Sequence, residues 1–177
     1  MTNRGTKADR LDVSDDAWSV SFEAFVTRHS AGLIKTLALI TLDQELATDA
    51  AQEAFLQLHL HWDEARGYEN PVAWLYRVGV NRCKDYRRHL ARTARLLERL
   101  GAAASSERAE DGQWTPERDF VQILRPLPNR QRTAAALYYL ADFSIAEIAQ
   151  AMNISEGAVN SHLHKARESL RAVLEAD

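Results

Sequence analysis

Cysteine is nearly absent from this chain of 177 residues: Cys83 is the single one, so an intramolecular disulfide is excluded. The first twenty residues hold no apolar run that could serve as a signal peptide, and no segment approaches the roughly 20 apolar residues of a membrane-spanning helix. We therefore expect a cytoplasmic protein without membrane insertion. Glycine and proline are scarce, at 7 and 4 residues, and 46% of the residues are hydrophobic. A wholly disordered chain is thereby excluded.

Sustained alternation of apolar and polar residues, the signature of strands, is also absent, so the sequence predicts an all-α fold. Apolar residues recur at helical spacing over residues 21–40, 44–62 and 71–90, and a polar loop covers 63–70. Asn70 followed by Pro71 predicts the N-cap and first residue of the third helix. Residues 100–119 are small and polar and contain a proline, which indicates a linker.

Shorter helical segments resume at residue 120. We therefore predict two small helical domains joined by a flexible linker, the second domain being a helix-turn-helix. The expected division is a flexible N-terminal tail over 1–18, a helical domain over 19–92, a linker over 93–119 and the helix-turn-helix domain over 120–177.

The overall charge disfavours a nucleic-acid ligand, because the net charge is -3 and the pI is near 6.1, whereas isolated DNA-binding domains are usually basic. The charges are segregated, however. Residues 41–76 hold seven acids and one base, and residues 77–99 hold eight bases and two acids. An acidic helix is thus followed directly by a basic one.

The third predicted helix has two chemically opposite faces. One arc, predicted to pack inward, collects Val72, Leu75, Tyr76, Gly79, Cys83, Tyr86 and Leu90. The opposite stripe holds Trp74, Arg77, Asn81, Lys84 and Arg88. The cations of this stripe can displace counterions from phosphates, and the Trp74 ring can stack on a base. The stripe therefore suits a nucleic-acid ligand. The alternative is a solvated basic face with Trp74 half-buried; Arg82, Arg87, Arg92 and Arg95 extend the positive field and favour DNA or RNA.

The C-terminal segment has the residue pattern of a helix-turn-helix. Ser144 and Glu147 predict a capping box, Asn153 a left-handed helix end, and Ser155 the cap of the second helix. Val159, Leu163, Ala166 and Leu170 form its buried stripe, which leaves Ser161, His164 and Lys165 exposed. In DNA-binding modules of this shape the second helix lies in the major groove. A plain helical hairpin is the alternative.

No metal site, cofactor site or catalytic site is expected. The histidine pairs at 59 and 61 and at 162 and 164 are two residues apart, so they point to different faces of a helix. A nucleophile with its base, a phosphate-binding loop and a ligand cluster are all missing from the sequence, so we do not expect an enzyme.

The chain resembles the extracytoplasmic-function (ECF) group of bacterial RNA polymerase sigma factors. The resemblance to the two structured domains of that group lies in three segments in this order: DAAQEAFLQL (49–58), NPVAWLYRVGVNRCKDYRR (70–88) and the stretch from Leu127 to Leu170. The resemblance implies an initiation factor that binds core polymerase through its beta-prime and beta subunits and recognises promoter DNA. An anti-sigma factor is a further partner that the family suggests.

The resemblance also implies roles for individual residues. The polymerase contact falls on Asp49, Gln52, Glu53 and Leu56. The minus-ten contacts fall on Tyr68, Asn70, Trp74, Arg77, Asn81, Lys84 and Arg88. The minus-thirty-five contacts fall on Arg130, Ser155, Glu156, Gly157, Asn160, Ser161, His164, Lys165 and Arg167.

The chain departs from the family at two places. His59, Leu60 and His61 stand where relatives carry Trp and basic residues, which weakens the expected polymerase contact there. Asn160 and His162 stand where relatives carry Lys or Arg, and Ala158 where they carry Thr, so we expect weak phosphate anchoring by the C-terminal domain. Two other functions stay open: a sigma mimic that binds an anti-sigma partner, and a helix-turn-helix repressor with a helical dimerisation domain.

Overall fold

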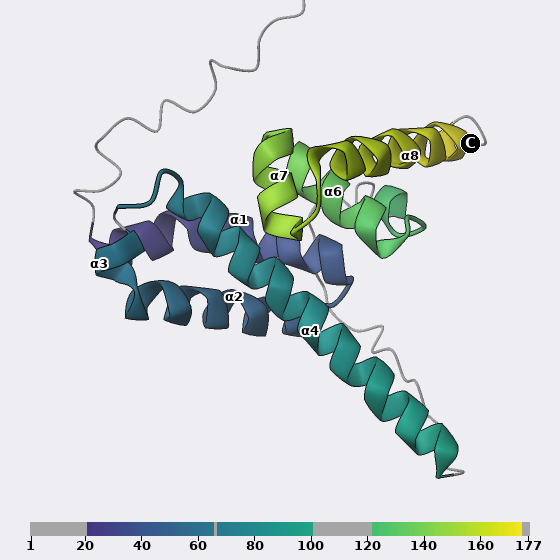
Figure 1. The fold of residues 1–177 in the computed structure, drawn as a ribbon, viewed down its shortest axis with the longest axis horizontal. Coiled ribbons are helices and arrows are strands. Elements are labelled where there is room, and N and C mark those ends of the chain that lie inside the picture. Colours follow the sequence, from purple (N-terminus) through teal and green to yellow (C-terminus); the bar gives the residue numbers. More distant parts are fainter. Residues whose placement is uncertain (1–20, 66, 101–121, 175–177) are drawn as a thin grey trace, which may run out of the picture.

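The computed structural model of the chain describes residues 21–65, 67–100 and 122–174. Within these ranges the regular structure is helical and contains no strand, which confirms the predicted all-α class (Figure 1). The predicted N-terminal tail and residues 101–119 of the predicted linker lie outside the described residues.

The first two helices, α1 (Phe22–Thr41) and α2 (Gln44–Leu60), lie side by side (Figure 1). Leu42 adopts a left-handed conformation, with φ of 59°, and ends α1. Asp43 then caps α2 by accepting a hydrogen bond from the Leu46 amide at 2.9 Å. The turn α3 (Trp62–Ala65) is helical where we predicted that the polar loop begins.

Helix α4 (Pro71–Arg99) packs its first half against α1 and α2, and Leu75, Tyr76 and Cys83 are buried as predicted. Tyr86 and Leu90 were also predicted to pack inward, and this was wrong, because they are 42% and 49% exposed. The second half of α4 extends away from the other helices, so its apolar arc has no described neighbour to pack against (Figure 1).

The helix also continues to Arg99, past the predicted end near Leu90 and into residues assigned to the linker. Residues 91–99 (ARTARLLER) are mostly alanine, leucine, arginine and glutamate, which have high helix propensities. Helix propensity therefore extends α4 where tertiary packing does not require it.

The C-terminal helices are α6 (Asn129–Tyr139), α7 (Ile145–Met152) and α8 (Glu156–Leu174), preceded by a helical turn at residues 122–124. The predicted capping box between Ser144 and Glu147 is confirmed, and so is the left-handed conformation of Asn153. The Ser155 hydroxyl accepts a hydrogen bond from the Ala158 amide at 3.2 Å and starts α8. Helices α7 and α8 thus form the expected helix-turn-helix.

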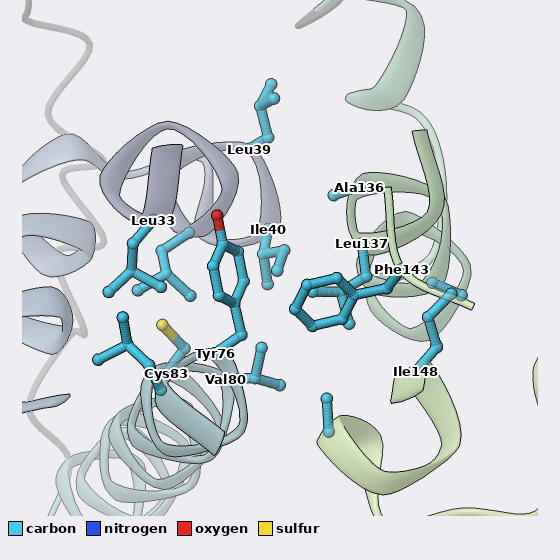
Figure 2. Close-up of a cluster of buried hydrophobic side chains, with 14 of the residues drawn as sticks. Leu33, Leu39, Ile40, Tyr76, Val80, Cys83, Ala136, Leu137, Phe143 and Ile148 are labelled. Carbon is cyan, nitrogen blue, oxygen red and sulfur yellow. The ribbon is translucent and has the colours of Figure 1, made fainter. Parts of the chain in front are cut away.

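The buried apolar residues of the two halves belong to one continuous cluster. Helix α1 contacts α6, and α4 contacts α7. In Figure 2, Tyr76 and Val80 of α4 and Ile40 of α1 face Phe143 and Leu137 of the C-terminal half. We expected two separate domains joined by a flexible linker, and that expectation did not include this shared core.

Candidate nucleic-acid and protein-binding surfaces

Helix α2 presents an acidic and apolar face. Asp49 and Gln52 are exposed, and Leu56, one turn further along, is 52% exposed. Glu53 is less available, because its Oε1 lies 3.6 Å from Arg82 Nη2 of α4 and accepts a hydrogen bond from Gln57 at 3.1 Å. Carboxylates beside an exposed leucine suit a partner helix that is cationic and partly apolar.

The unusual histidine at the end of α2 has a packing role. The His59 ring lies 4.6 Å from the Phe22 ring, centroid to centroid, and Trp62 packs edge-on against Phe22 at 5.3 Å and Phe25 at 5.4 Å. These rings join the start of α1 to the end of α2. The departure from the family at position 59 therefore coincides with an aromatic cluster that holds the two helices together.

The predicted stripe on α4 is exposed at its cationic positions. Arg77, Lys84 and Arg88 are exposed, although Arg88 Nη1 lies 3.5 Å from the carboxylate of Asp85. Asn81 and Trp74 are half-buried. Trp74 packs against the exposed Tyr68 ring, with centroids 6.1 Å apart, and the pair forms an aromatic surface at the N-terminal end of the stripe.

Arg87 does not belong to this basic surface, although the sequence suggested that it extends the positive field. Its guanidinium donates a hydrogen bond to the Ile40 carbonyl at the end of α1. Burial lowers the pKa of Arg87. The residue therefore ties α4 to α1, and spacing along one helix could not reveal this, because the acceptor lies on another element.

Asn70 makes two hydrogen bonds through its side-chain amide. Its Oδ1 accepts from the Ala73 amide at 2.9 Å, which confirms the predicted N-cap. Its Nδ2 donates to Glu147 Oε1 of α7, a contact across 77 residues of sequence. Nothing in the sequence indicated this second bond, because Glu147 was assigned only to the capping box of its own helix.

The recognition helix α8 exposes nearly all the residues predicted to face DNA. The exposed set is Ser155, Glu156, Gly157, Asn160, Ser161, His164, Lys165 and Arg167. Arg167 reaches across to α6, where its Nε donates to the Tyr139 hydroxyl at 3.1 Å and its guanidinium lies 6.0 Å from the centroid of the Tyr138 ring. His164 Nδ1 lies 3.3 Å from Glu168.

His162 is half-buried and lies among cations. Burial lowers its pKa most, and the positive charges of Arg130 and Lys165 lower it further. His162 is therefore mostly neutral at pH 7. Arg130, exposed in the first turn of α6, adds a second cation to this corner beside Lys165 of α8.

The Cys83 thiol is buried, and burial raises its pKa to about 11. Over the described residues, no group of three or more His, Cys, Asp or Glu side chains could hold a metal ion. None of the described helices combines the length and the apolar character needed to cross a membrane.

Comparison with known proteins gives matches to both halves of the chain. The family models described as "Sigma-70 region 2" and "Sigma-70, region 4" match residues 20–93 and 117–170. The "ECF RNA polymerase sigma factor SigM" of Bacillus subtilis is 28% identical over 139 residues, which cover 77% of this chain and 85% of the relative.

Two solved structures are also similar. CnrH, in complex with the cytosolic domain of CnrY, is 26% identical with a TM-score of 0.59, and the match covers 92% of this chain and 94% of that chain. The sigma factor RpoE of Bartonella quintana, in complex with the anti-sigma factor NepR, has a similar fold. Its TM-score is 0.68 at 21% identity, over 88% of this chain and 98% of that chain.

Proposed function

We propose that α2 binds core polymerase and that α4 and α8 bind promoter DNA. The basis is that the chain belongs to the sigma-70 family of RNA polymerase sigma factors, in its ECF group. The observation that carries this assignment is the opposite chemistry of two adjoining helices. Helix α2 exposes carboxylates and a leucine, and α4 exposes cations beside aromatic rings.

The polymerase contact is proposed for Asp49, Gln52, Glu53 and Leu56. From the family resemblance we infer that this motif contacts the coiled coil of the beta-prime subunit. Asp49 and Glu53 are four residues apart and so share one face of α2, which supports contact with a cationic surface. Glu53 would exchange its ion pair with Arg82 for one with polymerase.

The minus-ten contact is proposed for the loop before α4 and the stripe along it. Tyr68 and Trp74 offer ring faces on which an unstacked base can stack, and Arg77, Lys84 and Arg88 follow the backbone of the single strand. Asn70 and Asn81 add amide groups that can hydrogen-bond base edges. Such a surface favours melted DNA over a duplex.

The minus-thirty-five contact is proposed for the start of α8 together with Arg130. The N-terminal residues of a recognition helix reach base edges in the major groove, and Ser155, Glu156, Gly157, Asn160 and Ser161 are exposed at the start of α8. Arg130 and Lys165 would contact phosphates, which position the protein without reading sequence.

The wider setting of the proposal follows from the family. We place the protein in the cytoplasm with RNA polymerase, as an initiation factor and not a catalyst, with an anti-sigma factor as a candidate regulator. The minus-ten unit is proposed over 19–92 and the minus-thirty-five unit over 120–177. The α4 residues beyond 92 then continue the first unit as an extended helix.

Run-off transcription with purified core polymerase, on a library of promoters with randomised minus-ten and minus-thirty-five segments, tests the function. We expect transcripts that require the added protein and share a sequence preference in both segments. The variant Asp49→Lys, Glu53→Lys serves as the control that lacks the polymerase contact. Duplex binding without transcription would instead indicate a repressor, and failure to bind core polymerase would indicate a sigma mimic.

A further inference from the structure

Tyr139, the last residue of α6, contacts the recognition helix α8 through its hydroxyl. The residue is 47% exposed, and the hydroxyl accepts a hydrogen bond from Arg167 Nε at 3.1 Å. The Arg167 guanidinium also lies 6.0 Å from the centroid of the Tyr138 ring, which packs edge-on against Tyr139 with the ring centroids 4.9 Å apart. Two aromatic side chains of α6 therefore hold one cation of α8.

These contacts leave hydrogen-bond donors on both side chains. Arg167 uses its Nε for Tyr139, and its Nη groups bond to no residue that the structure describes, so they can form the forked pair of bonds that a phosphate accepts. A phenol hydroxyl both accepts and donates. The Tyr139 hydroxyl, which accepts from Arg167, therefore still has its own hydrogen to donate. Because the two groups are hydrogen-bonded to each other, their remaining donors can reach the same anion.

The surface beside Arg167 is hollowed and carries more positive than negative charge. The hollow is lined by His164, Arg167, Glu168 and Arg171. Glu168 already has a neighbour of its own, since its carboxylate lies 3.3 Å from His164 Nδ1, whereas Arg171 is exposed. Two guanidiniums beside one carboxylate favour an anion over a cation at this place.

The two ends of α6 support different sides of α8, against which α6 packs (Figure 1). Lys165 and Arg167 are two residues apart, so they point in directions about 200° apart around the helix. Arg130, in the first turn of α6, lies on the Lys165 side, because the charges of both residues act on His162. Tyr139, at the other end of α6, lies on the Arg167 side. A helix in the major groove has a DNA backbone along each side, so each end of α6 lies where phosphates would pass.

We propose that Tyr139 and Arg167 together bind one backbone phosphate of duplex DNA, and that the Tyr139 hydroxyl both orients the guanidinium and donates to the same phosphate. The inference rests on the duplex-binding role proposed above for α8. It gives the recognition helix an anchor on the side where Asn160, two turns before Arg167, supplies no charge. The site positions α8 and reads no base, because a phosphate contact carries no sequence information.

The first test removes the hydroxyl alone. The probe is a fluorescent DNA duplex of random sequence, and fluorescence anisotropy follows its binding by the full-length chain at low salt. Tyr139→Phe keeps the ring beside Tyr138 and removes one hydrogen bond to a charged group, so we expect about tenfold weaker binding. Tyr86→Phe is the matched control, because it removes the hydroxyl of another exposed tyrosine, on the apolar arc of α4, and should bind as wild type does.

A double-mutant cycle tests whether the two side chains act on one phosphate. Arg167→Ala should weaken binding and make the slope of log K against log salt less steep by about 0.9, the value for one lost phosphate contact. Adding Tyr139→Phe to Arg167→Ala should then weaken binding less than about twofold, because the phosphate is no longer held beside the hydroxyl. Arg28→Ala removes an exposed cation of α1 and should leave the slope unchanged.

Three results would overturn the proposal. Costs that multiply in the double variant would show that the two side chains act separately. A lower midpoint of thermal unfolding for Tyr139→Phe with wild-type affinity would make the pair a brace between α6 and α8. A wild-type chain that does not bind the duplex would reject the site outright.

Run-off transcription separates this site from the proposed function. Transcripts that require the wild-type protein, together with unchanged duplex binding by Tyr139→Phe, would reject the phosphate site and leave the proposed function standing. Weaker duplex binding by Tyr139→Phe and by Arg167→Ala, without any transcription by the wild-type protein, would support the phosphate site and reject the function.

Discussion

The salt dependence of duplex binding should report directly on the recognition helix. Asn160 is exposed near the start of α8, at a position where the family resemblance predicts a cation. We predict that Asn160→Lys adds one phosphate contact there. His162→Arg should add less than a full contact, because His162 is half-buried and already lies beside the charges of Arg130 and Lys165.

The expected size of the effect follows from counterion release. Each neutralised phosphate changes the slope of log K against log salt by about -0.9. Between 50 and 200 mM salt, a fourfold change, the affinity advantage of Asn160→Lys should therefore shrink by about 3.5-fold. The gain should be similar for many duplex sequences, because a phosphate contact does not read bases.

Fluorescence anisotropy of the full-length chain on a labelled duplex, repeated at several salt concentrations, measures the slope. Ser169→Lys is the matched control, because it adds the same charge to an exposed position in the last turns of α8, away from the recognition end. The proposed placement of α8 on DNA would be refuted if the two lysine variants had equal slopes. It would also be refuted if the slope for Asn160→Lys equalled that of wild type.

The remaining predictions concern the other surfaces and the core. Asp49→Lys with Glu53→Lys should abolish co-purification with core polymerase without changing helical content by circular dichroism; retained binding would reject the α2 contact. Arg77→Ala with Arg88→Ala should spare polymerase binding but sharply reduce permanganate reactivity of promoter thymines; normal opening would make the stripe a solvated face. At pH 8, a pKa of about 11 leaves about one Cys83 thiol per thousand ionised. Iodoacetamide should therefore modify Cys83 more than about a hundredfold faster in denaturant, and comparable native and denatured rates by mass spectrometry would contradict its burial.

Local chemistry made several helix ends predictable. Asn70, Ser144, Asn153 and Ser155 each act on backbone groups within four residues, so the sequence contains both the capping group and the group it caps. The exposed side of α8 followed from periodicity alone, because its apolar stripe packs on neighbouring helices of the same unit.

Contacts between distant segments were not predictable in the same way. The sequence assigned Arg87 to the exposed positive field and indicated nothing for Arg132, yet both donate to the Ile40 carbonyl, 47 and 92 residues away. Tyr86 and Leu90 were predicted to be buried and are exposed. Their spacing indicates a buried face, but burial needs a second element, and the described helices place none beside that part of α4.

Gly79 lies where α4 crosses α1. An added Cβ at this position would lie 2.9 Å from Leu37 Cδ1, so the buried Leu37 side chain would have to shift to make room for it. The helix runs on from Gly79 to Arg99, about 30 Å at 1.5 Å per residue. A tilt of roughly six degrees at this crossing would move that end by about 3 Å, close to the spacing of one base pair. A substitution at Gly79 that tilts α4 should therefore move the Arg99 end of the helix much further than the residues next to Gly79.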